Sequence, residues 1–188
     1  MAQRKVVLES VGRGILVNNP AGMRATGELE DGKKKVRSTV QHSPDEDAAT
    51  SAYWTADRSS LAFPAMNFWA GMKAAAKGYK SPIAKKLALP PLIAGDVEIT
   101  PDMIPFGTTE YQIDMRRAVV QRNGIIRSRA WLPIWKLTFT VSWETQFLGD
   151  KDGWLWENLE VLGTRVGIGD FRPQRGGPFG RFKVVGIE

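Results

Sequence analysis

The sequence predicts an α+β fold in which an antiparallel sheet carries two helices on one face and a basic β-hairpin is inserted. Three patterns predict it. Residues 137–143, LTFTVSW, alternate apolar and hydroxyl side chains as a half-buried strand does. Residues 64–78 and 153–166 repeat apolar side chains at helical spacing. Asn123-Gly124 stands inside a β-rich stretch, which is typical of a tight hairpin turn.

The beginning of the chain predicts a strand followed by a long loop. Residues 5–10 and 14–17 are apolar and β-branched, with a kink or bulge expected at Gly12 and Gly14. Residues 18–49 are polar and rich in turn formers, so we expect a long, partly mobile loop there. Its run of lysines either lies in solvent or contacts phosphate.

The middle of the chain predicts a hairpin, a helix and an insertion. Residues 51–63 are expected to form a short hairpin that leads into the first helix, whose first turn holds Pro64 and whose aromatic residues face the core. Residues 82–105 are interrupted by prolines and are interpreted as inserted sequence, with a short helix at 83–89 and a short strand at 96–99.

The arginine-rich stretch at residues 111–132, YQIDMRRAVVQRNGIIRSRAWL, predicts a positively charged hairpin turning at Asn123-Gly124. No acidic residue lies among its five arginines, which are Arg116, Arg117, Arg122, Arg127 and Arg129. Such an arm suits a polyanion. The alternative is a solvated arm whose charge prevents strand-edge pairing.

The last part of the chain predicts a strand, a helix and a closing strand. Residues 137–143 should bury their odd-numbered side chains. Asp152 is expected to cap the helix at 153–166, and residues 182–187 form the final strand. Without the insertions the order is strand, helix, strand, strand, helix, strand, which is the ferredoxin-like, or RRM-like, arrangement within one domain spanning residues 1–188.

The glycine-rich stretch at residues 167–181, GIGDFRPQRGGPFGR, lies between the last helix and the last strand. Glycine allows close backbone approach, arginine suits phosphate, and phenylalanine offers a flat face to bases. With the hairpin arginines, it supplies the candidate nucleic-acid-binding residues Gly167, Gly169, Phe171, Arg172, Arg175, Gly176, Gly177, Phe179, Gly180 and Arg181. The alternative is a tight connector whose glycines only permit the turn.

A glycine-rich loop at this place in a ferredoxin-like fold resembles the signature loop of the RAMP superfamily, whose members build CRISPR effector backbones and process guide RNA. The resemblance is carried by Gly167, Gly169, Gly176, Gly177, Gly180 and Arg181. It implies that residues 80–132 form a thumb-like insertion and that the protein coats RNA as a filament. The chain is short for such a backbone subunit and shows no second ferredoxin domain, which fits a compact or phage-borne relative.

Composition and missing motifs exclude several classes of protein. The 188 residues contain no cysteine, which excludes a disulfide scaffold and a thiolate metal site, and the formal net charge of +6 favours a polyanionic partner. The dinucleotide and phosphate-loop fingerprints are absent. We expect no cofactor and no metal site. No stretch predicts a signal peptide or a membrane span, so we expect a cytoplasmic protein.

These observations favour a non-enzymatic protein that binds single-stranded nucleic acid and oligomerises along the strand or joins a ribonucleoprotein. RNA is the favoured polymer, although the sequence itself does not choose between RNA and DNA. The alternative is a viral structural or inhibitory protein that contacts a protein partner. A third interpretation is a metal-independent ribonuclease that uses His42, the only histidine.

Overall fold

A four-stranded antiparallel sheet organises the protein. The computed structural model describes residues 1–17, 43–120 and 123–188, and within these ranges the side chains of residue 47 and residues 118–120 and 123–127 are left undescribed. The strand order is β4-β8-β1-β9, and every neighbouring pair is antiparallel. The four strands are β1 (Ala2–Val11), β4 (Val97–Thr100), β8 (Lys136–Trp143) and β9 (Arg181–Ile187).

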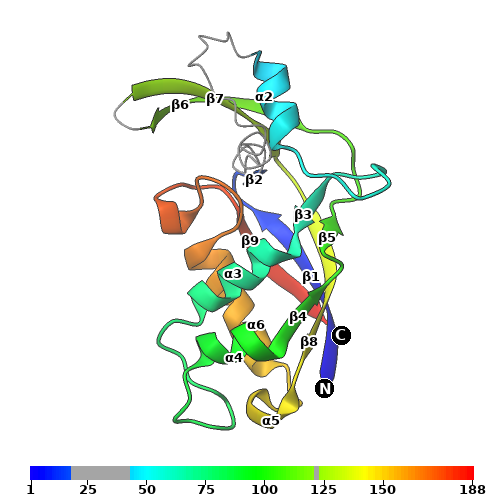
Figure 1. Ribbon diagram of the computed structural model, residues 1–188, viewed down its shortest axis with the longest axis vertical. Helices are drawn as coiled ribbons and strands as arrows, with labels where there is room; N and C mark the ends of the chain where they lie inside the picture. The colour runs from blue at the N-terminus through cyan, green and yellow to red at the C-terminus, as the bar shows by residue number, and fades with distance from the viewer. Residues whose placement is uncertain (18–42, 121–122) are drawn as a thin grey trace, which may run out of the picture.

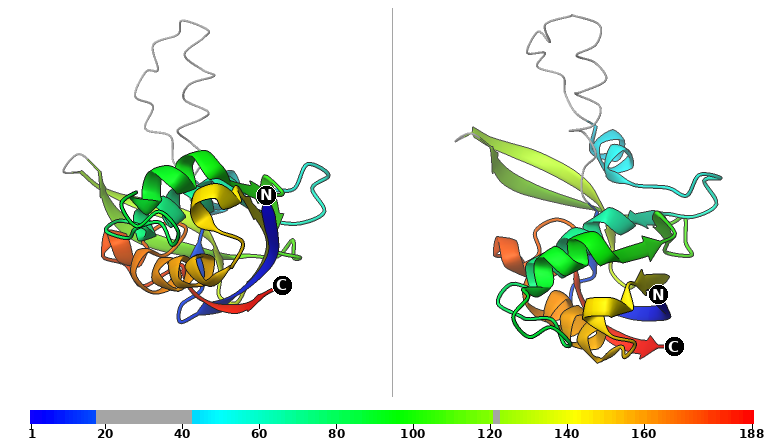
Figure 2. Two further views of the ribbon diagram at one scale, coloured as in Figure 1. Left: turned by 90° about the horizontal axis from the view of Figure 1, so that it is seen from below. Right: turned by 60° about the horizontal axis from the view of Figure 1, so that its bottom comes forward.

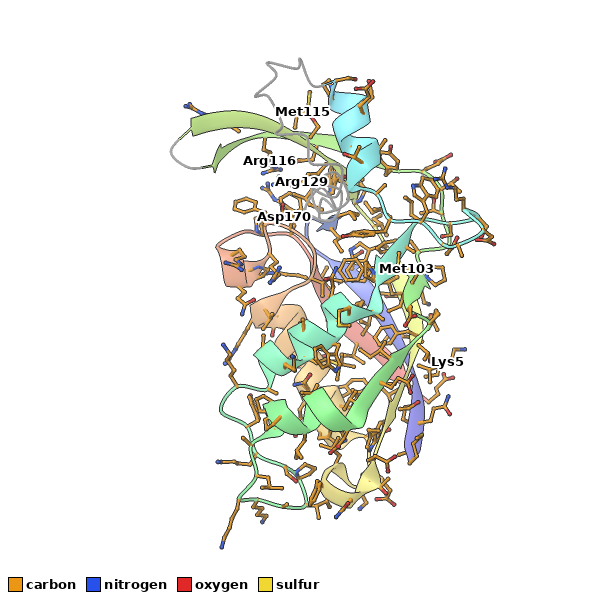
Figure 3. All side chains as sticks on the ribbon, viewed as in Figure 1. Lys5, Met103, Met115, Arg116, Arg129 and Asp170 are labelled. Carbon is orange, nitrogen blue, oxygen red and sulfur yellow. The ribbon has the colours of Figure 1, made fainter. Side chains whose placement is uncertain are left out.

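One face of this sheet is core and the other is polar. In β8 the predicted alternation is confirmed, because Leu137, Phe139, Val141 and Trp143 are all buried. Thr138 lies between two of them, and Lys136 precedes the first. Both lie on the open face with their side chains exposed. Lys5 of β1 also points away from the helices (Figure 3).

Two helices, α3 (Ala65–Ala75) and α6 (Gly153–Val161), lie on the apolar side of the sheet (Figure 1). Phe68 of α3 packs against Phe139 and Phe182, with ring centroids 4.9 and 6.1 Å away. The predicted helix at 153–166 is confirmed, although its end, Leu162–Val166 (η1), is a π-helical turn. Gly163 allows this turn to pack closely on β9, since a Cβ there would lie 2.3 Å from the carbonyl oxygen of Phe182. Asp152 occupies the N-cap position without a side-chain cap bond.

The expected kink near the N-terminus is instead a change of sheet. β1 ends at Val11, and β2 (Ile15–Leu16) pairs with β7 (Asn123–Leu132) in a second sheet. The order of this sheet is β2-β7-β6, in which β6 is Gln112–Val120. Gly12 and Gly14 both have positive φ, so the chain turns out of the first sheet between the two strands. The bulge of β1 lies elsewhere, at Val7/Leu8.

The prediction of a loop over residues 18–49 is wrong at its C-terminal end. Residues 18–42 lie outside the described part, but Pro44–Ser51 form helix α2. Pro44, followed by Asp45 and Glu46, is a helix-start pattern that we did not recognise in the sequence, although the helix has no apolar stripe. Tertiary contacts stabilise it: Ala48 is buried, and Ser51 Oγ accepts a hydrogen bond from the backbone N–H of Ala130 in β7.

Two further expectations are corrected in the middle of the chain. The hairpin at 51–63 is reduced to one bridge, Trp54 to Leu61, after which β3 (Ala62–Pro64) pairs with the unpredicted β5 (Met103–Pro105). The short helix begins at Leu89, not at residue 83, because two prolines occupy its first turn; it is α4 (Leu89–Asp96). Since α4 and β4 belong to the body of the protein, the projecting insertion is confined to the hairpin.

The hairpin itself is confirmed, but its turn is not where Asn-Gly predicted. β6 (Gln112–Val120) and β7 (Asn123–Leu132) pair so that Val120 faces Asn123, which places Asn123 and Gly124 within strand β7. The register is set at the base, where β7 also pairs with β2 and contacts α2. Figures 1 and 2 show this hairpin extending away from the body.

Among the described residues, no helix is long and apolar enough to cross a bilayer. The short helix α5 (Thr145–Leu148) follows β8.

Candidate nucleic-acid interface

The glycine-rich loop, residues 167–180, folds tightly back on the protein. Its 3-10 turn, Pro173–Arg175 (η2), is closed by a hydrogen bond from the Gly177 N–H to the Arg172 carbonyl oxygen. The N–H groups of Asp170 and Gly180 donate to the carbonyl oxygens of Leu16 and Gly14. The loop is therefore fastened along the segment that carries β2.

Most glycines of this loop shape the loop and do not face a ligand. A Cβ on Gly180 would lie 1.7 Å from the Ile168 carbonyl oxygen, and one on Gly177 would lie 1.8 Å from that of Phe171. Both residues are buried, so the prediction that they hold a ligand backbone is corrected. Gly176 is exposed, in the left-handed conformation.

The prediction that Phe179 offers a flat face to bases is also wrong. Its side chain is only 1% exposed, and the guanidinium of Arg116 lies over its ring, 4.6 Å from the centroid. Phe171 is different, because it is 38% exposed, has a positive φ of 47°, and lies 6.3 Å from Phe179 between ring centroids. Of the two predicted aromatic faces, only that of Phe171 reaches solvent.

Two of the hairpin arginines are paired with carboxylates. Arg116 donates two hydrogen bonds to the Asp114 carboxylate, at 2.6 and 2.9 Å, and these bonds raise its pKa. Nε of Arg129 lies 2.6 Å from Oδ2 of Asp170, an ion-pair distance, although its N–H is not aimed as a hydrogen bond requires. Figure 3 shows both arginines between the hairpin and the glycine-rich loop. The expectation of five unpaired arginines is wrong for these two.

The remaining candidates are scattered. Arg117 is exposed and has no carboxylate partner among the described residues. Arg127 faces Arg116 in the strand register, its side chain being undescribed, and Arg122 lies outside the described residues. Arg181 begins β9 next to buried Phe182, so it lies on the open face of the sheet, apart from the loop arginines.

A groove of about 300 Å³ lies between α3 and the glycine-rich loop. The loop side contains Arg172, Gln174 and Arg175, with Gly167, Ile168 and Gly169 behind them. The helix side consists of Asn67, Ala70, Gly71 and Ala74, which we did not predict. Their spacing along one helix face was visible in the sequence, and the small side chains of Ala70 and Ala74 were the signal that could have marked it. The space at Gly71 is taken by Leu162, whose Cδ1 would lie 2.7 Å from a Cβ there.

Two guanidinium groups give this groove its charge. Arg172 is held in place because it donates to the Gly169 carbonyl oxygen at 3.0 Å and to Gln174 Oε1 at 3.2 Å. Burial lowers its pKa, the neighbouring Arg175 lowers it further, and Asp170 opposes both effects. The described residues lining the groove include no carboxylate. Like charges held together in this way favour an anion between them.

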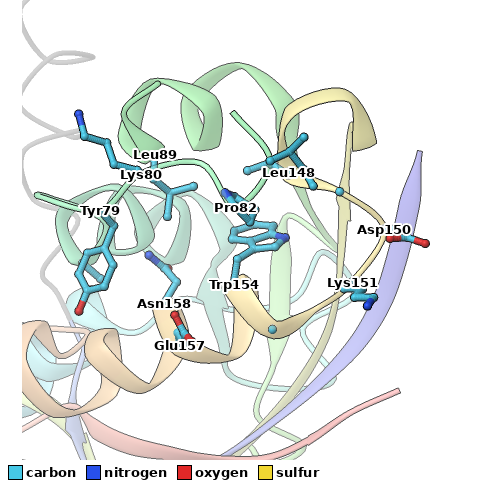
Figure 4. Close-up of a pocket in the computed structure, with 14 residues that line it drawn as sticks. Tyr79, Lys80, Pro82, Leu89, Leu148, Asp150, Lys151, Trp154, Glu157 and Asn158 are labelled. Carbon is cyan, nitrogen blue, oxygen red and sulfur yellow. The ribbon is translucent and has the colours of Figure 1, made fainter. Parts of the chain in front are cut away.

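A larger cavity, about 510 Å³, lies at the C-terminal end of α3, where Ala75 lines it (Figure 4). Its walls are largely apolar, with Leu89, Leu148 and Trp154 among them. Two lysines and two carboxylates line it as well: Lys80, Lys151, Asp150 and Glu157. Because both signs of charge are balanced there, the cavity has no preference for a polyanion.

Groups for catalysis or metal binding are not assembled in the described part of the chain. In residues 1–17, 43–120 and 123–188 no three side chains of His, Asp or Glu come together as a metal site. Asp45 and Glu46 lie in the first turn of α2 and not in a loop. His42 lies outside the described residues.

The sequence matches no protein-family model, and it has no significant similarity to a curated protein sequence.

Proposed function

We propose that this protein binds single-stranded nucleic acid without altering it chemically, with RNA as the favoured polymer and several copies along one strand. The observation that carries the proposal is the groove between α3 and the glycine-rich loop, where Arg172 and Arg175 lie without a lining carboxylate. Phosphate accepts hydrogen bonds from guanidinium in a fixed, planar geometry.

The small side chains opposite the arginines support the same proposal. Ala70 and Ala74 leave the backbone of α3 close to the groove, so a sugar-phosphate chain meets only methyl groups at these two positions. Gly71 instead makes room for the side chain of Leu162. Phe171 lies three residues before Gln174 on the same loop and is the exposed aromatic residue nearest in sequence to the arginines. A base of the bound strand would stack on it.

We place the bound strand on the helix side of the protein and not on the open face of the sheet. RNA-recognition modules stack bases on aromatic residues of their sheet. Here the aromatic residues of the four strands, Phe139, Trp143 and Phe182, are all buried in the core. On the open face, Glu9 is neutralised by Lys136 and Lys183 at 3.6 and 3.4 Å.

We further propose a ferredoxin-like arrangement and a distant relationship to the RAMP superfamily. The strand order β4-β8-β1-β9, with crossovers through α3 and α6, supports the ferredoxin-like arrangement. The position of the glycine-rich loop between the last helix and the last strand supports the relationship to the RAMP superfamily. Neither arrangement by itself establishes a function.

The test is fluorescence anisotropy of labelled single-stranded RNA, single-stranded DNA and duplex DNA, each in two lengths and at low and physiological salt. The protein is first freed of copurified nucleic acid. We expect tight, length-dependent binding of single-stranded RNA that weakens steeply with salt. Absence of binding at physiological salt would contradict the proposal and direct attention to a protein partner.

A further inference from the structure

Strand β6 is an open edge of the second sheet. In the order β2-β7-β6 it pairs only with β7, and no described residue bonds to its outer side. It is nine residues long and belongs to the hairpin that extends from the body (Figure 1). The outward backbone N–H and C=O groups of such a strand are ready to pair with another strand.

The two faces of β6 carry different side chains. Ile113 and Met115 share one face and are 37% and 60% exposed, so they present apolar surface to solvent. Asp114 and Arg116 share the other face and bind each other. Figure 3 shows Met115 and Arg116 on opposite sides of the hairpin.

We propose that β6 docks on β6 of a second copy of this chain, antiparallel, about a two-fold axis through Met115. Such an axis, perpendicular to the sheet, places each residue opposite the one at equal distance beyond Met115. Asp114 then faces Arg116 of the second copy, and Arg116 faces the second Asp114. The two Met115 side chains meet on the apolar face, and the pairing continues the sheet across the dimer.

The charges select this register over its neighbours. An axis through Asp114 sets two carboxylates opposite each other, and one through Arg116 or Arg117 does the same with two guanidinium groups. An axis through Ile113 places Arg116 opposite Glu110, but Glu110 precedes β6, so this register pairs fewer residues of the strand. A run of like charges is how an edge strand normally avoids pairing, whereas the Asp-x-Arg pattern of β6 is complementary to itself.

Cysteine cross-linking tests the register directly, because the chain has no cysteine of its own. Opposed residues of antiparallel strands have Cα atoms about 4.5–5.5 Å apart, within the range that a disulfide spans. We expect Met115→Cys to form a covalent dimer at least about tenfold faster than a control, because the dimer gives the thiols a high effective concentration. The control is Ile134→Cys, 87% exposed in the turn between β7 and β8. Equal rates for the two variants in the folded protein, or a difference in rate that persists in urea, would overturn the proposal.

Charge exchange gives an independent measurement by sedimentation velocity on nuclease-treated protein, so that bound nucleic acid does not join copies. The unaltered chain is expected to sediment as a dimer and Asp114→Arg as a monomer. Adding Arg116→Asp to that variant restores complementary charges and should restore the dimer. A monomeric unaltered chain, or a dimer that Asp114→Arg leaves intact, would refute docking through β6. Thermal unfolding of each variant verifies that it is folded.

Discussion

Oδ2 of Asp170 lies 2.6 Å from Nε of Arg129. This ion pair joins the glycine-rich loop to the base of the hairpin, two segments about forty residues apart in the sequence. Asp170 also accepts a hydrogen bond at Oδ1 from the N–H of Phe171, which orients the carboxylate. Arg116 reinforces the junction by covering Phe179. The hairpin base and the loop thus form one fastened unit beside the groove.

The substitution Asp170→Asn should loosen this junction. The amide would keep the shape of the side chain and its bond to the N–H of Phe171, but Arg129 would remain buried without its countercharge. We expect the free energy of unfolding to fall by about 1–3 kcal/mol. This is less than the loss expected for a fully buried ion pair, because the Asp170 side chain is partly exposed and solvent screens its charge. Urea denaturation measures this. Asp150→Asn, at an exposed carboxylate, is the control, and an equal effect in both variants would show that the ion pair contributes nothing.

Removing the two groove arginines should reduce nucleic-acid affinity without sequence preference. In Arg172→Ala/Arg175→Ala, the slope of log affinity against log salt should become shallower by about 1.4, because two phosphate contacts are lost and each contributes about 0.7 on a single strand. Anisotropy titrations at several salt concentrations measure the slope. The matched control, Lys85→Ala/Lys86→Ala, removes the same charge from an exposed loop. If the slope becomes shallower by the same amount in both variants, the groove is not the phosphate site.

Placing a carboxylate on the helix side of the groove should repel the strand. Ala70→Glu sets a negative charge opposite Arg172 and Arg175, and we expect affinity to drop about tenfold or more. Ala70→Gln separates bulk from charge and should bind more tightly than Ala70→Glu. Met66→Glu adds the same charge to an exposed position of α3 that does not line the groove. A loss of affinity as large in Met66→Glu would indicate a general charge effect.

Gly180 and Gly176 separate two roles of glycine in the loop. Both have positive φ, so alanine at Gly176 should cost about 1–2 kcal/mol of folding free energy from backbone strain alone. Alanine at Gly180 adds an overlap with the Ile168 carbonyl oxygen and should cost clearly more. Chemical denaturation of the two variants compares them. Equal costs would mean that the loop moves aside easily at Gly180.

Several elements were predictable because their pattern is local. The alternation in β8 and the apolar stripe of Leu155, Leu159, Leu162 and Val166 each record contact with a core, and the structure places these side chains there. The hairpin was predictable from two β-rich runs around a polar turn. Its turn position was not, because the register is decided at the base by β2 and α2.

Local patterns were enough to predict the α+β class, the main strands and helices, the basic hairpin and the glycine-rich loop, since hydrophobic period and turn chemistry depend on neighbours a few residues apart. Which basic and aromatic residues face solvent depends on the packing of distant segments. Phe179 is buried beneath Arg116, Arg129 is paired with Asp170, and α3 supplies half of the groove. These outcomes depend on segments far apart in the chain, and burial and charge pairing are properties of the packed surface that no local pattern contains.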